Sequence, residues 1–143
     1  MTNDLLIARV AGERIALAAI EVQSVIELGE IVPVPLAPRL VAGLATQRSR
    51  TLTVIDVALA LDLAPTIGGA RFAVVVEIEG VGYALAVDAV EHVIPALSPV
   101  QPAKIKLSPG WLHCAAGMVD TSVGTVLKVD LTRLVAGPEQ KAA

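Results

Sequence analysis

The second half of this chain repeats the pattern of the first half, and this repeat strongly limits the folds open to it. The first set of matches shares one spacing, because residue 10 corresponds to residue 78, an offset of 68. The matched segments are Val10-Ala11-Gly12 with Ile78-Glu79-Gly80, Ala16-Leu17-Ala18 with Ala84-Leu85-Ala86, and Val22, Val25 and Ile26 with Val90, Val93 and Ile94. Self-similarity at a fixed spacing indicates that one structural unit occurs twice.

A second set of matches continues the repeat at an offset of 74. It consists of Ala42-Gly43-Leu44 with Ala116-Gly117-Met118, Thr51 with Thr125, and Asp56 with Asp130. The change of offset predicts a short insertion in the proline-rich stretch 95–109 of the second half. Proline has no backbone N–H to donate, so the segments around Pro33 and Pro99 are predicted to end one sheet and redirect the chain.

Strand signals dominate both halves. β-branched runs bounded by turn residues predict strands at Leu5–Val10, Ile15–Ala18, Thr51–Ile55, Phe72–Ile78 and Thr125–Val129. The alanine-rich stretch Ile15–Glu27 leaves a helical alternative open. Asp56 and Asp130 each precede a short apolar segment and are expected to cap a short helical turn. The sequence therefore predicts an all-β protein with short helical turns.

The repeat and the composition together predict two small barrels. About five short strands in each half suit a closed barrel, because closure removes exposed sheet edges. Hydrophobic residues make up 55% of the 143 residues and aromatic residues only 2%, so the two barrels are expected to share an aliphatic core. We predict one domain over 1–143, with subdomains at 1–67 and 68–136, a Gly68-Gly69 linker and a flexible tail at 137–143. Exchange of terminal segments between the barrels or between chains stays open.

Composition excludes several function classes. A net charge of −3 and the scarcity of aromatic residues argue against nucleic-acid binding. A single cysteine, Cys114, excludes an internal disulfide and a multi-cysteine metal site. No charge-free run approaches the roughly 18 residues of a membrane-spanning helix, and the start shows no secretory signal. We expect a cytoplasmic protein without cofactor, metal or membrane insertion.

At this point the sequence resembles the CheW family of chemotaxis adaptors over about residues 5–135. The order and spacing of the following segments carry the resemblance: Leu6–Leu17, Val22–Ile26, Pro33-Val34-Pro35, Val41–Leu44, Arg48, Leu52–Asp56, Val76–Ile78, Val87–Val90 and Val126–Asp130. The resemblance implies a CheW-like domain built from two five-stranded SH3-like barrels. It also implies a non-enzymatic adaptor that couples the regulatory domain of the histidine kinase CheA to the cytoplasmic tips of methyl-accepting chemoreceptors. Such an adaptor is recruited to receptor arrays at the membrane.

One segment departs from the family pattern. The family usually carries Asn-Leu-Arg-Gly, then a hydrophobic pair and proline, whereas this chain reads Thr46-Gln47-Arg48-Ser49-Arg50 followed by Thr51-Leu52-Thr53. Only Arg48 is kept at a stretch that the family places at its partner-binding surface. The alternative is therefore a divergent CheW-like scaffold that recruits a kinase or another partner outside chemotaxis.

Arg48 is the leading candidate for partner contact, because arginine can hold a carboxylate in a bidentate manner. The plainer alternative is a solvated hairpin tip. The resemblance adds the neighbouring Gly43, Leu44 and Thr46. It also places receptor or kinase contacts at Val22, Gln23 and Val25, although Val22 and Val25 could equally be core. Apolar residues of the first proline-rich crossing suggest a groove for a receptor helix, with core packing as the alternative: Ile31, Val34, Leu36 and Leu40.

No constellation of residues predicts catalysis. His113 and Cys114 are adjacent, so on a strand their side chains point to opposite faces and cannot form a dyad with each other. The other histidine, His92, is distant in sequence. A small hydrolase that depends on Cys114 is the remaining alternative, and we predict no catalytic or metal-binding residue.

Overall fold

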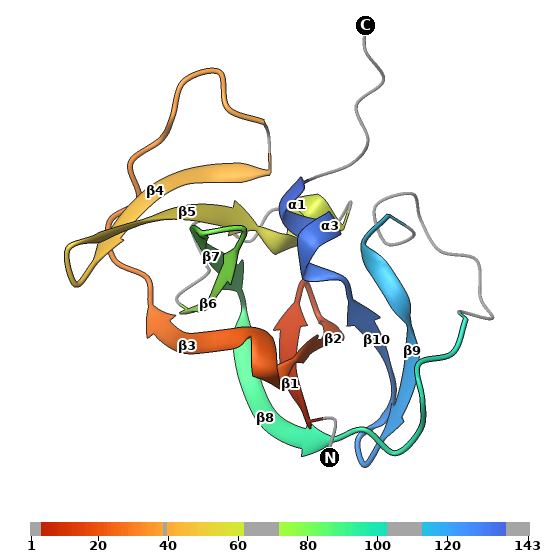
Figure 1. The fold of residues 1–143 in the computed structure, drawn as a ribbon. Coiled ribbons are helices and arrows are strands. Elements are labelled where there is room, and N and C mark those ends of the chain that lie inside the picture. Colours follow the sequence, from red (N-terminus) through yellow and green to blue (C-terminus); the bar gives the residue numbers. More distant parts are fainter. Residues whose placement is uncertain (1–3, 39, 62–71, 103–112, 137–143) are drawn as a thin grey trace, which may run out of the picture.

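The computed structural model describes residues 4–38, 40–61, 72–102 and 113–136. The elements in chain order are β1 (Asp4–Val10), β2 (Glu13–Ala18), the 3₁₀ helix η1 (Ala19–Glu21), β3 (Val22–Glu27), β4 (Val41–Gln47), β5 (Arg50–Asp56), α1 (Val57–Ala60), β6 (Phe72–Ile78), β7 (Val81–Val87), β8 (Ala89–Pro95), β9 (Ala115–Thr121), β10 (Gly124–Val129) and α3 (Leu131–Ala136) (Figure 1). The predicted all-β class is confirmed. The helical alternative for Ile15–Glu27 is wrong, since only η1 interrupts the strands there. The predicted linker Gly68-Gly69 and tail 137–143 lie outside the described residues.

The strands form two five-stranded sheets, which we call the β1 barrel and the β6 barrel. The β1 barrel has the strand order β8-β1-β2-β10-β9, and the β6 barrel has the order β3-β6-β7-β5-β4. Replacing each strand by its repeat partner converts one order into the other. The repeat read from the sequence is therefore a repeat of structure, and each sheet is consistent with an SH3-like barrel.

The two barrels exchange strands between the halves of the chain. The β1 barrel combines β1 and β2 with β8, β9 and β10, and the β6 barrel combines β3, β4 and β5 with β6 and β7. The boundary at residue 67 therefore does not separate the barrels, and the assignment of 1–67 and 68–136 to one barrel each is corrected. The physical reason is that β2 pairs in parallel with β10, and β5 with β7, so each sheet joins strands from both halves of the chain.

The pleat of the strands explains why so many residues are apolar. Along β1, Leu5 and Ile7 face the interior of the β1 barrel, whereas Leu6, Ala8 and Val10 face a core shared by both barrels. Strands β6 and β7 alternate in the same way between the β6 barrel and the shared core. The central strands are thus buried on both faces, and the predicted shared aliphatic core is confirmed.

Short helices complete the shared core between the sheets (Figure 1). The N–H of Leu59 donates to Asp56 Oδ1 at 3.3 Å, and the N–H of Arg133 donates to Asp130 Oδ1 at 3.1 Å. Both predicted aspartate caps are confirmed. Each supplies an acceptor to a helix start whose amides lack partners within the helix.

Gly43 and its repeat partner Gly117 allow the crossing segments to dock. The N–H of Val32 donates to the carbonyl of Leu44, and the N–H of Leu44 donates back to Val32, both at 2.8 Å. A Cβ at Gly43 would lie 2.3 Å from the Val32 oxygen, and one at Gly117 would lie 2.5 Å from the Gln101 oxygen. Both glycines also have positive φ, at 153° and 147°, so a side chain is disfavoured on two grounds.

Candidate partner-binding cleft

A surface cleft of about 290 Å³ lies at the seam of the β6 barrel, between edge strand β3 and the hairpin of β4 and β5. Strands β3 and β4 are the two ends of the strand order in this sheet, and no pairing between them occurs among the described residues. Residues from four strands and one turn line the cleft: Gln23, Ser24, Val25, Ile26, Gln47, Arg48, Arg50, Leu52 and Val75. Its floor reaches the barrel interior, because Leu52 and Val75 belong to that core.

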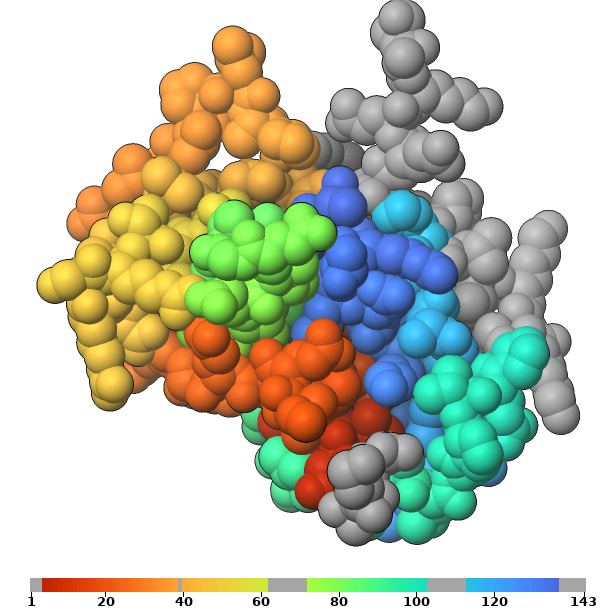
Figure 2. Space-filling model, in the orientation of Figure 1, coloured from red at the N-terminus to blue at the C-terminus, as the bar shows by residue number. Residues whose placement is uncertain are grey.

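Arg48 stands at the tip of the hairpin that forms one wall of the cleft. Arg48 and Ser49 have φ of 50° and 64°, a pair of left-handed residues that gives a tight two-residue turn between antiparallel strands. This hairpin projects from the body of the molecule (Figure 2). Arg48 is exposed and takes part in no ion pair among the described residues. Its guanidinium is available to an incoming carboxylate.

Arg50, at the start of β5, also lines the cleft and is already engaged. Its Nη1 donates to Gln23 Oε1 at 3.0 Å, and its Nη2 donates to Glu77 Oε1 at 2.9 Å. Gly82 makes this reach possible, because a Cβ there would lie 2.7 Å from Arg50 Nη2. Arg50 therefore links β5 to β6 and β3 across the glycine of β7, and Glu77 offsets its charge.

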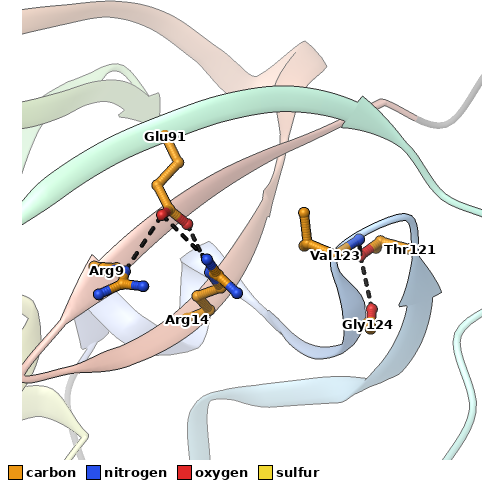
Figure 3. A network of polar contacts seen from close by, with 6 residues as sticks. All are labelled: Arg9, Arg14, Glu91, Thr121, Val123 and Gly124. Atoms are coloured by element: carbon orange, nitrogen blue, oxygen red, sulfur yellow. Dashed lines mark hydrogen bonds and ion pairs between the residues drawn. The ribbon is translucent and has the colours of Figure 1, made fainter.

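The corresponding end of the β1 barrel carries a polar cluster of different composition. Glu91 lies between Arg9 and Arg14, with 3.3 Å from Arg9 Nε to Oε2 and 2.8 Å from Arg14 Nε to Oε1 (Figure 3). By the repeat, Arg9 corresponds to Glu77 and Glu91 to Gln23. The hydrogen bond from Arg14 lowers the pKa of the Glu91 carboxyl and outweighs desolvation, which raises it. The positive charges of Arg14 and Arg9 lower this pKa further.

Three of the predicted partner-binding residues lie at or beside the cleft. Gln23 and Arg48 line it, and they come from segments that are 25 residues apart in the sequence. Thr46 is exposed on β4, next to the hairpin tip. Gln23 occupies a β-bulge, since Val22 pairs with Val76 and Ser24 already pairs with Val75. A bulge of this kind redirects a side chain, which here turns toward Arg50.

The other predicted residues have different surroundings. Val22 packs against the shared core, and Leu40 is buried within it at 8% exposure. Gly43 is buried and Leu44 is half-buried at the docking point of the crossing. Leu40 and Gly43 are thus mostly covered by packing, and their contact with a partner stays a prediction.

The first crossing does not form one apolar groove. Val34 is 38% exposed and Leu36 fully exposed, whereas Ile31 packs against the β6 barrel core and Leu40 is buried. The apolar residues of this segment therefore point in different directions. They do not line one groove together, as the sequence had suggested.

Sequence reasoning missed Ser24, Arg50, Glu77 and Gly82. The alternation of side chains along a strand could have indicated Arg50. It lies two residues before Leu52 and therefore on the barrel-interior side of β5. A charged residue on that face must find polar partners at the barrel end. Gly82 showed no comparable signal, since its use depends on a neighbour on another strand.

Three further features of the described residues bear on candidate chemistry and membrane insertion. No group of three or more His, Cys, Asp or Glu side chains is found among them. Cys114 is buried, with its Sγ 3.8 Å from the Ala60 carbonyl oxygen. None of the helices in the described part of the chain is long and apolar enough to span a membrane.

Comparisons with known proteins identify a matching family and a similar solved structure. The family model of the CheW-like domain matches residues 4–139. Among solved structures, the scaffolding protein TtCheW from Thermoanaerobacter tengcongensis is similar with a TM-score of 0.80 and 22% sequence identity, over 94% of this chain and 92% of that chain. At this identity, the structural similarity establishes the fold alone. No curated protein sequence matches the chain.

Proposed function

The chain belongs to the family of CheW-like domains, and on this basis we propose that it is a non-enzymatic adaptor. Its partners are the regulatory domain of the histidine kinase CheA and the cytoplasmic tip of a methyl-accepting chemoreceptor. It acts in the cytoplasm and is recruited to receptor arrays at the membrane. It needs no cofactor for this role, because an adaptor works by holding its partners in a fixed arrangement.

The two-barrel architecture supports this proposal. An adaptor for two partners needs two separate surfaces whose relative position is fixed. Here the end of the β1 barrel, with Arg9, Arg14 and Glu91, and the cleft of the β6 barrel are separate surfaces of different composition. The shared core and the exchanged strands join the two barrels into one unit. A shift in one bound partner can then bias the conformation of the other.

The observation that carries the proposal is the position of Gln23 and Arg48. The family resemblance assigns partner contacts to both, and they line the same cleft although they are distant in sequence. Arg48 offers an exposed guanidinium, and the neighbouring Val25 is 44% exposed. Arginine is among the residue types enriched in protein–protein hot spots.

The test is calorimetric titration of the chain with the CheA regulatory domain and, separately, with a soluble fragment of the receptor tip. We expect Arg48→Glu to weaken the binding of at least one partner by tenfold or more, since an interfacial arginine contributes on the order of 2 kcal/mol. The melting temperature should stay unchanged, because Arg48 makes no ion pair among the described residues.

The matched control is Ser122→Glu. Ser122 is the repeat counterpart of Arg48, and it is exposed in the turn between β9 and β10. This variant introduces the same carboxylate at the same place of the other barrel. Equal losses for Arg48→Glu and Ser122→Glu would indicate a general charge effect and would remove Arg48 from the interface. Absence of binding to both partners at tens of micromolar would contradict the proposal itself.

A second candidate function is a scaffold for a different kinase or regulatory partner. The observation that favours it is Arg50, which stands where the family carries a hydrophobic residue and ties Gln23 and Glu77 at the cleft mouth. A difference from the family at the cleft mouth is consistent with a different partner. Neighbouring genes that encode receptors and a kinase would favour chemotaxis, and their absence would favour the second candidate.

A further inference from the structure

The two barrels differ in how their ends are closed. In the β1 barrel, Val123 from the turn between β9 and β10 packs against the barrel core formed by Leu5, Ile7, Ala16, Val119 and Val126. The hydroxyl of Thr121 holds this turn, since it donates to the Gly124 carbonyl at 2.7 Å and accepts from the Val123 N–H at 3.2 Å (Figure 3). An aliphatic side chain of the protein itself thus covers this barrel end.

The β6 barrel has no such side chain at the corresponding place. The repeat counterpart of Val123 is Ser49, which is polar and exposed. The floor is of similar size in both barrels, because Val75 replaces the larger Ile7 and Leu52 replaces the smaller Val126. The cleft of about 290 Å³ lies next to this position, since Arg48 and Arg50 on either side of Ser49 line it.

We propose that this cleft receives one small aliphatic side chain of a partner, flanked on the partner by a carboxylate that binds Arg48. This inference rests on the proposed adaptor function and specifies the chemistry that the cleft recognises. The aliphatic group is argued from Val123, which shows what fits an equivalent barrel end. It would contact Leu52, Val75 and Ile26, which belong to or pack against the barrel core.

The charges at the cleft argue for the carboxylate. Glu77 already offsets Arg50, with 2.9 Å between the paired atoms. Arg48 is the cation of the lining that has no ion pair among the described residues. A partner carboxylate next to the inserted side chain would pair with it, and charge-assisted hydrogen bonds to arginine are among the stronger ones.

The probe for this chemistry is isovalerate, which joins an isobutyl group to a carboxylate. We expect titration of the ¹⁵N-labelled chain to give saturable amide shifts at Ser24, Gln47, Arg48 and Leu52, with a dissociation constant on the order of 10 mM. Acetate lacks the aliphatic group and should bind about tenfold more weakly. The alcohol 3-methylbutan-1-ol lacks the charge and should bind roughly fivefold more weakly.

Two variants and a matched control locate the site. Ser24→Phe places a ring in the cleft from exposed edge strand β3 and should abolish the isovalerate shifts. His92→Phe places the same ring at the repeat counterpart on β8, which is also exposed, and should leave them unchanged. Arg48→Gln, which removes the charge and keeps the floor, should weaken isovalerate roughly fivefold and acetate similarly. Unsaturable shifts, shifts outside the cleft, or equal effects of both phenylalanines would overturn the inference.

The outcomes separate this inference from the proposed function. If Ser24→Phe loses isovalerate but keeps the CheA regulatory domain and the receptor tip, the adaptor function stands and the inferred role of the cleft in partner recognition is wrong. If the unmodified chain binds isovalerate in the cleft but neither partner, the recognised chemistry stands and the chemotaxis partners are wrong. If Ser24→Phe loses isovalerate binding and the binding of one partner, and His92→Phe loses neither, the results support both the inference and the proposed function.

Discussion

Expressed separately, residues 1–67 and residues 68–143 are each expected to remain unfolded. Each half would lose the partners that complete its sheets, because β1 pairs with β8, β2 with β10, β3 with β6, and β5 with β7. Each half would also expose its side of the shared core. A barrel made from consecutive strands of one half would, in contrast, keep most of its pairings after the division.

The magnitude follows from the shared core. Residues 1–67 contribute the large buried aliphatic side chains Leu6, Val10, Ile15, Leu17, Leu40, Ile55, Val57 and Leu61. Burial of one such side chain stabilises a protein by about 1.5–3 kcal/mol, so exposure of all eight costs roughly 12–24 kcal/mol. A domain of this kind is stable by about 5–15 kcal/mol in total. The loss exceeds the whole stability, even before the missing strand pairs are considered.

The assay is circular dichroism and ¹H–¹⁵N correlation spectroscopy of each half and of their equimolar mixture. The halves alone should give collapsed amide dispersion and no cooperative thermal transition. The mixture should recover dispersed resonances, because both sheets can then form. A dispersed spectrum with a cooperative transition for either half alone would contradict the exchange of strands and would favour barrels built from consecutive strands.

Three further predictions concern single positions. Gly43→Ala should lower the free energy of unfolding by about 2–4 kcal/mol in urea titrations, because the new Cβ meets the Val32 carbonyl. Gly29→Ala is the control and should cost far less, since a Cβ there meets nothing within 4 Å. The pKa of Glu91 is lower in the folded state than its unfolded value of about 4.5. The stability that Glu91 contributes is therefore present above the unfolded pKa and is lost as the pH falls through the folded pKa. Glu91→Gln should remove this loss and so flatten the acid side of a plot of melting temperature against pH. Asp56→Ala and Asp130→Ala should each cost about 1 kcal/mol from the lost cap, with the larger loss at Asp56 because it is fully buried; equal losses in thermal unfolding would contradict the role of burial.

Local patterns, composition and the repeat together predicted five of the ten described strands, the two helix caps and the shared core. They could not assign strands to sheets. Matching residues such as Val10 and Ile78 show which strands are equivalent, but they do not show whether β2 pairs with β10 or with β5 of its own half. Both arrangements bury the same side chains, so the apolar pattern is identical for both. The choice depends on the connections between strands, about which the repeat carries no information.

The candidate site was predictable in part for a similar reason. Arg48 and Gln23 could be named from the family resemblance, and their meeting in one cleft follows from the hairpin and the bulge. The packing role of Gly43 follows from the approach of the Val32 carbonyl, a contact between distant segments. The reach of Arg50 over Gly82 depends on a parallel strand pair, which local sequence does not reveal.

Whether the seam of the β6 barrel is a partner surface can be decided by an amide-shift map of the ¹⁵N-labelled chain with the CheA regulatory domain and the receptor tip, each added in turn. We expect at least one of them to shift or broaden the resonances of Gln23, Ser24, Gln47 and Arg48, while the other partner leaves this cleft accessible. If both proteins bind and the cleft resonances stay in place with either, the seam is not the partner surface and the proposed role of the cleft is wrong.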